Sequence, residues 1–422
     1  MTARAGATRP LARLAGFAAV AIASAVVPLL SVPALTASYG ADGWAAVATG
    51  MSVGAAAAVV IELGYGLTGP QMVAREGPRA RAATLVLSAW TRAMLFVPAA
   101  AVASGVAAAV APHHGGAAAL MAAAAAAQGM ATVWFYTGTG RPHLILACDI
   151  APRVVAAGAS ALLLTHGAPL IVHPALLLGA SLVAVCVGVT VAVRGTGVRR
   201  RIRPRRCLRV LRIQSRVTTG RLASSVYIAL PTAMVATVAP LATATFASVE
   251  RVQRLVLAGL AILPGAAQSW VGSAQDRRER TRRAWRATGV LVLTGGVAAA
   301  ALVFAMDAIT LLLFQGTVEV DRSLALLSAA VIVLTSASRG VGGLVLVAMQ
   351  RPHKVADAAL GGSAVGVVAI PVAARALGAA GGLIGEVAAE LATLTSLCVA
   401  ALRRGDNRAA DRRRERSAAL HG

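Results

Sequence analysis

The stretch that decides the fold is RGTGVRRRIRPRRCLRVLRIQSRVTTGR, residues 194–221, which contains eleven arginines and no acidic residue. On each side lies a largely apolar block, residues 1–193 and 222–402. Each block is long enough for six membrane-spanning helices of about 20 residues. Short loops rich in Lys and Arg remain on the cytoplasmic side of a membrane. The stretch therefore predicts a basic cytoplasmic linker between two six-helix bundles.

The composition supports a membrane protein. Of the 422 residues, 58% are hydrophobic and only 13% are charged, with a mean hydropathy of +0.74, which is unusual for a soluble globular chain. The net charge of +24 would fit nucleic acid if it lay on a soluble surface. Here the basic residues lie between apolar runs, where membrane topology and anionic lipids explain them. We expect anionic membrane lipids as partners and no nucleic acid.

The hydropathy predicts an all-α polytopic membrane protein with about twelve spans. Most of the 40 Lys and Arg residues fall in loops that this topology assigns to the cytoplasm, including a basic tail, residues 403–422. An even number of spans places both termini in the cytoplasm, and we expect the cell membrane as the location. The expected spans are 14–37, 44–63, 84–111, one that ends near 136, 144–165, 169–193, 222–240, 245–271, 287–314, 323–348, 355–376 and 381–402.

The two halves share one short motif. Gly140-Arg141-Pro142-His143 follows the fourth span, and Gln350-Arg351-Pro352-His353 follows the tenth. With the matching hydropathy, this predicts an internal duplication. Because six spans per half give both halves the same orientation, the repeat axis should lie along the membrane normal. Transporters built in this way bind cargo between two bundles and alternate its access to the two sides.

Four stretches carry a family resemblance. They are Ser38-Tyr39-Gly40 with Gly43-Trp44, Glu62-Leu63-Gly64-Tyr65-Gly66-Leu67, Leu344–Gly366 (LVLVAMQRPHKVADAALGGSAVG) and residues 376–382 (ALGAAGG). They resemble polysaccharide exporters of the multidrug, oligosaccharidyl-lipid and polysaccharide exporter superfamily, and the resemblance covers nearly the whole chain. It implies a flippase that moves a polyprenyl-diphosphate-linked glycan from the inner to the outer leaflet, with a polysaccharide polymerase or glycosyltransferases as protein partners.

Arginines within the expected spans are candidate binding residues. An ionisable group inside a membrane costs several kcal/mol unless it faces a wet cavity or a partner. Arginine can hold a diphosphate through paired, charge-assisted hydrogen bonds. We therefore expect a cationic substrate cavity, in which Arg251 and Arg339 contact the headgroup. The complete candidate set is Arg92, Arg153, Arg251, Arg254 and Arg339.

Three of these arginines also have a structural interpretation. Asp149 and Arg153 are four residues apart, as are Glu250 and Arg254, so each pair can neutralise itself on one helix face. This leaves Arg251 as the less compensated member of its cluster. Arg92 is alternatively a residue of the membrane interface.

The acidic candidates for proton or cation coupling are Glu386, Glu390 and Asp149. Glu386 and Glu390 are four residues apart in the last expected span, and acidic groups at that depth are functional candidates. A coupled exporter would need acidic groups of this kind to bind its proton or cation.

Catalytic signatures are absent from the sequence. No Gly-rich loop with Lys and Ser or Thr is present to hold a nucleotide phosphate. The pair His113-His114 has no neighbouring ligand residues, and the four cysteines show no paired spacing. We expect neither an enzyme nor a metal or cofactor site.

Two other transporter classes stay open. A proton- or sodium-coupled multidrug exporter of the same superfamily would favour acidic cavity residues over basic ones. A major-facilitator transporter is suggested by twelve spans and by Gly69-Pro70 with Arg75, Gly77 and Arg79 after the second span. A membrane scaffold for a glycosyltransferase is a fourth class, but it would not need buried arginines.

Overall fold

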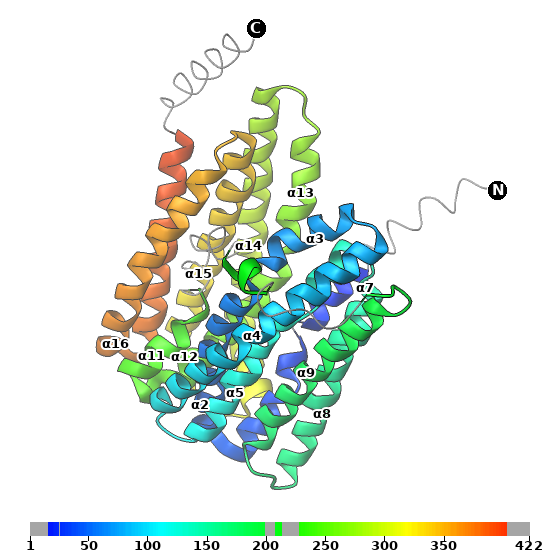
Figure 1. The fold of residues 1–422 in the computed structure, drawn as a ribbon. Coiled ribbons are helices and arrows are strands. Elements are labelled where there is room, and N and C mark those ends of the chain that lie inside the picture. Colours follow the sequence, from blue (N-terminus) through cyan, green and yellow to red (C-terminus); the bar gives the residue numbers. More distant parts are fainter. Residues whose placement is uncertain (1–15, 25, 199–206, 213–227, 403–422) are drawn as a thin grey trace, which may run out of the picture.

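The computed structural model describes residues 16–24, 26–198, 207–212 and 228–402, and every element assigned among them is a helix. The basic linker at 194–221 lies largely outside these residues, and the basic tail at 403–422 lies wholly outside them. We call residues 16–198 the first half and residues 228–402 the second half. The bundle of long helices is shown in Figure 1.

The first half contains one long kinked helix and a series of shorter ones. Gly40, with φ 61°, interrupts α2 where the sequence predicts the turn between the first two spans. The helices are η1 (Val27–Leu29), α2 (Val32–Glu62), α3 (Tyr65–Arg75), α4 (Pro78–Val110), α5 (Gly115–Ala127), η2 (Gln128–Met130), α6 (Val133–Gly138), α7 (Pro142–Ile145), the π-helix η3 (Leu146–Ile150), α8 (Ala151–Thr165) and α9 (Val172–Val193).

The second half ends in the longest helix, α16. Gly378, with φ 58°, interrupts it, again where the sequence predicts a turn between two spans. A positive φ is readily adopted only by glycine, which explains both interruptions. The helices are α11 (Pro231–Val238), η4 (Pro240–Ala242), α12 (Thr243–Leu260), α13 (Ile262–Gly272), α14 (Arg277–Phe314), α15 (Arg322–Gly340), the π-helix η5 (Val341–Leu346) and α16 (Pro352–Leu402).

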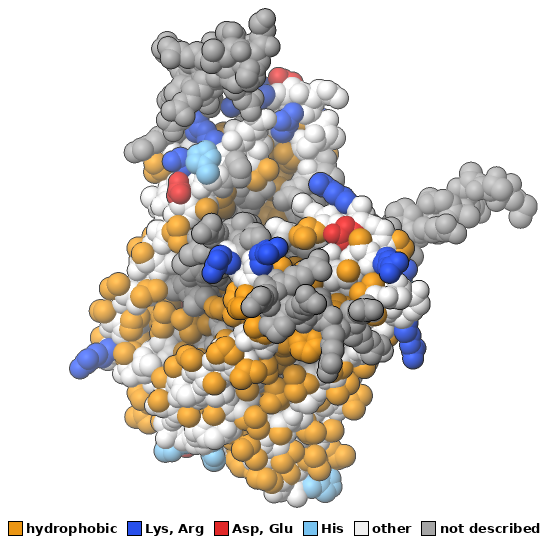
Figure 2. Space-filling view, viewed as in Figure 1, with side chains coloured by type: hydrophobic (Ala, Val, Ile, Leu, Met, Phe, Trp, Pro, Cys, Tyr) orange, Lys and Arg blue, Asp and Glu red, His pale blue; other side chains and the backbone are white. Residues whose placement is uncertain are grey.

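Within the described residues, nine helices are long and apolar enough to cross a membrane. The last of them spans residues 353–402 and contains the Gly378 kink, so it accounts for two of the predicted spans. The chain is an all-α polytopic membrane protein, and this helix pattern agrees with about twelve spans. On the face shown in Figure 2, most Lys and Arg side chains lie in the upper part, while the lower end shows histidines. The orientation of the termini stays a prediction.

The two copies of the Arg-Pro-His motif form the same turn. Gly140 and Gln350 both have positive φ, 67° and 60°. The backbone N–H of Arg141 donates to Tyr136 O at 2.9 Å, and that of Arg351 donates to Leu346 O at 2.8 Å. The prolines that follow, Pro142 and Pro352, begin α7 and α16, a position where proline loses no needed hydrogen bond. This shared geometry supports the predicted duplication.

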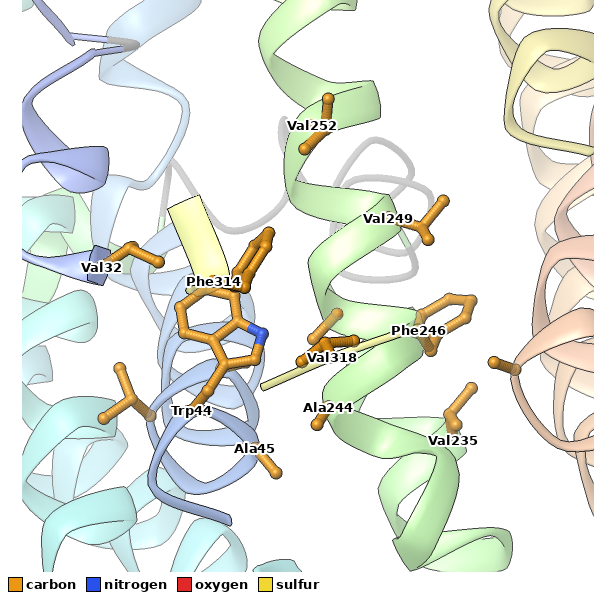
Figure 3. Close-up of a cluster of buried hydrophobic side chains, with 14 of the residues drawn as sticks. Val32, Trp44, Ala45, Val235, Ala244, Phe246, Val249, Val252, Phe314 and Val318 are labelled. Carbon is orange, nitrogen blue, oxygen red and sulfur yellow. The ribbon is translucent and has the colours of Figure 1, made fainter. Parts of the chain in front are cut away.

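The two halves meet along α2 and α12. Figure 3 shows Trp44 of α2 beside Phe314 of α14, with α12 lying between α2 and the last helices. The ring centroids of Trp44 and Phe314 are 5.4 Å apart. Two turns further along α2, Ser52 Oγ donates to Ala229 O at 2.6 Å and accepts from Ala233 N at 3.2 Å. These contacts position α2 against the start of the second half.

Candidate functional site

Helix α12 carries the densest group of charged side chains within the expected membrane spans. Glu250, Arg251, Gln253 and Arg254 lie within five consecutive positions. Because successive residues of an α-helix are rotated by about 100°, this short segment presents polar groups to more than one neighbour. In Figure 3, α12 stands between α2 and the last helices, so the polar segment faces both halves.

A cavity of about 310 Å³ lies between the halves, and we call it the inter-half cavity. Its α2 wall runs from Trp44 to Val59, a rise of about 22 Å along a helix. The opposite wall comes from α12 and from the segment around the start of α11. The lining residues are Trp44, Ala48, Met51, Ser52, Ala55, Val59, Ile228, Ala229, Thr232, Ala247, Glu250, Arg251 and Arg254.

Both carboxylate oxygens of Glu250 are engaged by other residues. The hydroxyl of Thr232 on α11 donates to Oε2, and Arg254 Nε donates to Oε1 at 3.0 Å. The ion pair predicted from the four-residue spacing is therefore present. Among the described residues, Arg251 has neither a hydrogen bond nor an ion pair, although it lines the same cavity. Arg251 is thus the uncompensated cation of this segment, as its sequence position predicts.

A second cavity, of about 400 Å³, lies inside the second half, and we call it the second-half cavity. Gln253 Nε2 donates to Glu386 Oε2 at 2.9 Å, which connects α12 to α16. Arg339 of α15 donates to Leu257 O at 2.8 Å. The lining residues are Ile228, Pro231, Gln253, Arg254, Leu257, Ala258, Ala261, Val331, Thr335, Arg339, Glu386 and Glu390.

Arg254 lines both cavities. Glu386 is buried, and Glu390 Oε2 is a buried oxygen without a hydrogen-bond partner among the described residues. A buried carboxylate without full hydrogen bonding is costly when it is charged. The second-half cavity therefore holds two acidic groups that a proton or cation would stabilise, close to two arginines.

Asp149 and Arg153 lie elsewhere, in the first half. They form an ion pair, with Arg153 Nη2 2.9 Å from Asp149 Oδ1. Arg153 lines a small cavity of about 80 Å³ together with Gln128 and His173, and His173 Nδ1 is 2.7 Å from Ser160 Oγ. The ion pair that the four-residue spacing of Asp149 and Arg153 predicts is therefore confirmed. The structure does not bring this pair together with the residues of α12 and α16.

Arg92 is a buried structural group and lines none of these three cavities. Its side chain is 0% exposed, so it is covered by the protein, and its alternative position at the membrane interface stays a prediction. It donates to Gly129 O at 3.1 Å and to Ala131 O at 3.0 Å, carbonyls at the break between α5 and α6. Its guanidinium also lies over the Tyr65 ring, 5.6 Å from the ring centroid. These partners satisfy the charge within the first half.

Sequence reasoning missed the neutral polar residues that connect the charges. Thr232 and Gln253 carry no charge and gave no hydropathy signal, yet they hold Glu250 and Glu386. Gln253 could have been noticed because it follows Glu250 by three positions, which places both on neighbouring parts of the helix surface.

No family model and no curated protein matches the chain. Among solved structures, it is similar to a multidrug resistance MATE family transporter of the MOP superfamily in an inward-facing conformation. The TM-score is 0.63 at 14% identity, covering 90% of this chain and 93% of that one. It is also similar to the eukaryotic MATE transporter AtDTX14, with a TM-score of 0.61 at 15% identity, covering 97% and 99%. A MATE in complex with MaD3S gives 0.55 at 14% identity, covering 92% and 94%.

These structural similarities bear on which transporter fold the chain has. They place the chain with MATE structures, so they do not support the major-facilitator alternative. Membership of the polysaccharide-exporter branch stays a prediction, since the neighbours are MATE transporters. At these identities the similarity concerns the fold, and on that basis the chain is a multi-pass membrane protein with the fold of the MATE transporters.

Proposed function

We propose that this protein is an ion-coupled exporter that moves an amphipathic solute across the membrane by alternating access. The observation that carries this proposal is the polar segment of α12, which borders both a cavity between the halves and a cavity that contains two carboxylates. The structural neighbours favour this multidrug-type function over the lipid-linked glycan flippase implied by the sequence resemblance.

The solute would occupy the inter-half cavity. Its volume of about 310 Å³ is at the lower end of the range of small-molecule pockets. Its walls combine apolar side chains such as Met51 and Val59 with a few charged groups. Contacts between Trp44 and Phe314 close the halves near the end predicted to be external. We infer that the solute enters from the cytoplasmic side in this conformation.

Coupling would take place on Glu386 and Glu390. Gln253 connects Glu386 to α12, which is also the helix that lines the solute cavity. Neutralisation of a buried carboxylate removes a large desolvation penalty, so binding of a proton or a cation would change the contact between α16 and α12. Arg254, shared by both cavities, would carry that change to the solute.

The test is transport by purified protein in liposomes with an imposed proton or sodium gradient. The assay would follow a panel of labelled amphipathic anions and cations. Gradient-driven transport is expected for at least one solute, and Glu386→Gln and Glu390→Gln should each remove the dependence on the gradient. Glu319→Gln, a substitution at an exposed position outside both cavities, is the control and should leave transport unchanged. Full gradient-driven transport by both cavity variants would contradict the coupling role.

The lipid-linked glycan flippase is the second candidate. The uncompensated charge of Arg251 in the inter-half cavity favours it, because a diphosphate headgroup would bind to a guanidinium. A labelled polyprenyl-diphosphate sugar in the same liposomes tests it directly. Its protein-dependent arrival in the outer leaflet would support the flippase, and Arg251→Ala should then abolish the signal.

A further inference from the structure

We propose that the inter-half cavity is an anion-binding subsite centred on Arg251, and that the exported solute is an amphipathic anion. Such a solute has an apolar body and a phosphate, sulfonate or carboxylate group. The inference rests on the proposed export function and specifies its substrate class.

The first step is the charge balance of the cavity. Three charged side chains line it, namely Glu250, Arg251 and Arg254. Glu250 and Arg254 form an ion pair, and Thr232 occupies the other carboxylate oxygen of Glu250. The described part of the cavity therefore retains one net positive charge, and that charge is on Arg251.

The second step is the α2 wall, which supplies no counter-ion. Its lining residues are Trp44, Ala48, Met51, Ser52, Ala55 and Val59, none of which is acidic. Ser52, the only hydroxyl among them, is already hydrogen-bonded to the backbone at Ala229 and Ala233. No carboxylate and no free hydroxyl on this wall is therefore available to hold a cation.

The third step is an unused donor. The indole N–H of Trp44 is buried and has no acceptor among the described residues, and Figure 3 shows the indole nitrogen on the side of the ring that faces α12. An N–H group can donate to an anion but cannot accept a hydrogen bond from an ammonium group. Trp44 and Arg251 thus both favour a ligand rich in acceptors.

The energetics point in the same direction. A guanidinium within the membrane without a partner is energetically unfavourable. An anionic ligand would remove this cost and form charge-assisted hydrogen bonds, whereas a cationic ligand would add repulsion. The apolar side chains of Met51 and Val59 would contact the body of the solute.

Two sources could supply this chemistry: a lipid-linked diphosphate or a water-soluble amphipathic anion. Three probes distinguish them, namely farnesyl diphosphate, 1-naphthalenesulfonate and the matched cation 1-naphthylmethylammonium. Binding of each to the purified full-length protein would be measured by isothermal titration calorimetry. The wild-type protein should bind at least one anion and should not bind the cation. Binding of the sulfonate alone indicates a soluble cargo, and binding of the diphosphate alone indicates a lipid-linked one.

Variants at Arg251 test the role of the charge. Arg251→Gln should raise the Kd for the anion about 10- to 100-fold, as expected for loss of hydrogen bonds to a charged group. Arg251→Lys should retain part of the affinity because it keeps the charge. Arg251→Glu should bind the ammonium probe, a gain that an unfolded protein could not show. Arg322→Gln removes a positive charge at an exposed position outside the cavity and should bind as the wild type does.

Three results would overturn the inference. They are equal binding of cation and anion by the wild type, unchanged anion affinity in Arg251→Gln, and no binding of either anion. Transport assays separate this failure from failure of the export function. Gradient-driven export of the cation alone would contradict the anion subsite and leave the exporter standing. Binding of an anion through Arg251 without transport of any probe under either gradient would contradict the exporter and leave the subsite standing.

Discussion

At the scale of single residues, Arg92 and Arg251 show that the same sequence signal can have two outcomes. Both lie within expected spans. Arg92 donates to the carbonyls of Gly129 and Ala131 and contacts aromatic rings, so its charge stabilises a helix break. Arg251 has no such partners in the described part of the chain and lines a cavity. The local environment therefore separates a structural arginine from a binding one.

Arg92→Ala is expected to reduce stability without altering the binding cavity. The carbonyls of Gly129 and Ala131 would lose their donor inside the first half, which should lower the free energy of unfolding by about 2 to 4 kcal/mol. Thermal unfolding in detergent measures this loss, and Arg92→Lys should recover part of it. A variant that is as stable as the wild type but does not transport would instead place Arg92 in the transport mechanism.

Arg339→Ala is expected to abolish transport while the protein still inserts. Arg339 connects α15 to α12 through Leu257 O and lines the cavity that contains Glu386 and Glu390. Loss of this charged donor should reduce transport about tenfold or more. The transport rate in liposomes, normalised to the amount of inserted protein, is the measurement. Unchanged transport would remove Arg339 from the site.

At the scale of helices, the packing of α2 against α5 depends on small residues. A Cβ on Gly54 would lie 2.3 Å from Ala122 O, and one on Gly50 would lie 2.4 Å from Ala118 O. Membrane helices gain little from apolar burial against each other, so close approach through small residues supplies much of their attraction. The inner side of α2 is fixed in this way, which leaves its other side to line the inter-half cavity.

Gly54→Ala should therefore be destabilising, by about 1 to 3 kcal/mol for an overpacked contact. Gly105→Ala in α4 is the matched control, because nothing lies within 4 Å of a Cβ at that position and alanine favours a helix interior. Thermal unfolding of the two variants should separate them clearly. Equal stability would show that α2 and α5 can move apart without cost.

At the scale of the whole molecule, the halves are held together at the end predicted to be external. Trp44 packs on Phe314, and the Thr36 hydroxyl, which lies 3.0 Å from Val32 O of its own helix, also lies 3.3 Å from Leu313 O. If the protein alternates between two conformations, these contacts must separate in the other one. They should therefore set the balance between the two states.

Trp44→Ala is expected to shift the protein toward the state that is open at this end. Removal of a large aromatic contact should stabilise the open state relative to the closed one by about 1 kcal/mol or more. Spin labels at Asp42 and Glu319, exposed positions on the two halves, would report the change as a larger population of long distances. An identical distance distribution in variant and parent would show that this contact does not control opening.

The sequence by itself determined the membrane spans, the turns at Gly40 and Gly378, and the ion pairs at four-residue spacing. These features depend on neighbouring residues along the chain, where hydropathy, glycine and helix periodicity act locally. The Arg-Pro-His turns at Arg141 and Arg351 are local in the same sense. Because these turns depend on local sequence, the internal duplication could be predicted from them.

Only the tertiary structure decided which charges face a cavity and which are satisfied. Gln253 reaches Glu386 across 133 positions of the chain, and Arg92 reaches Gly129 across 37. Such contacts depend on how each helix is rotated and where its neighbours end, and no local pattern encodes them. The physical reason is that the cost of a buried charge depends on its partners in space, so sequence could identify Arg251 as uncompensated but could not show the cavity that it lines.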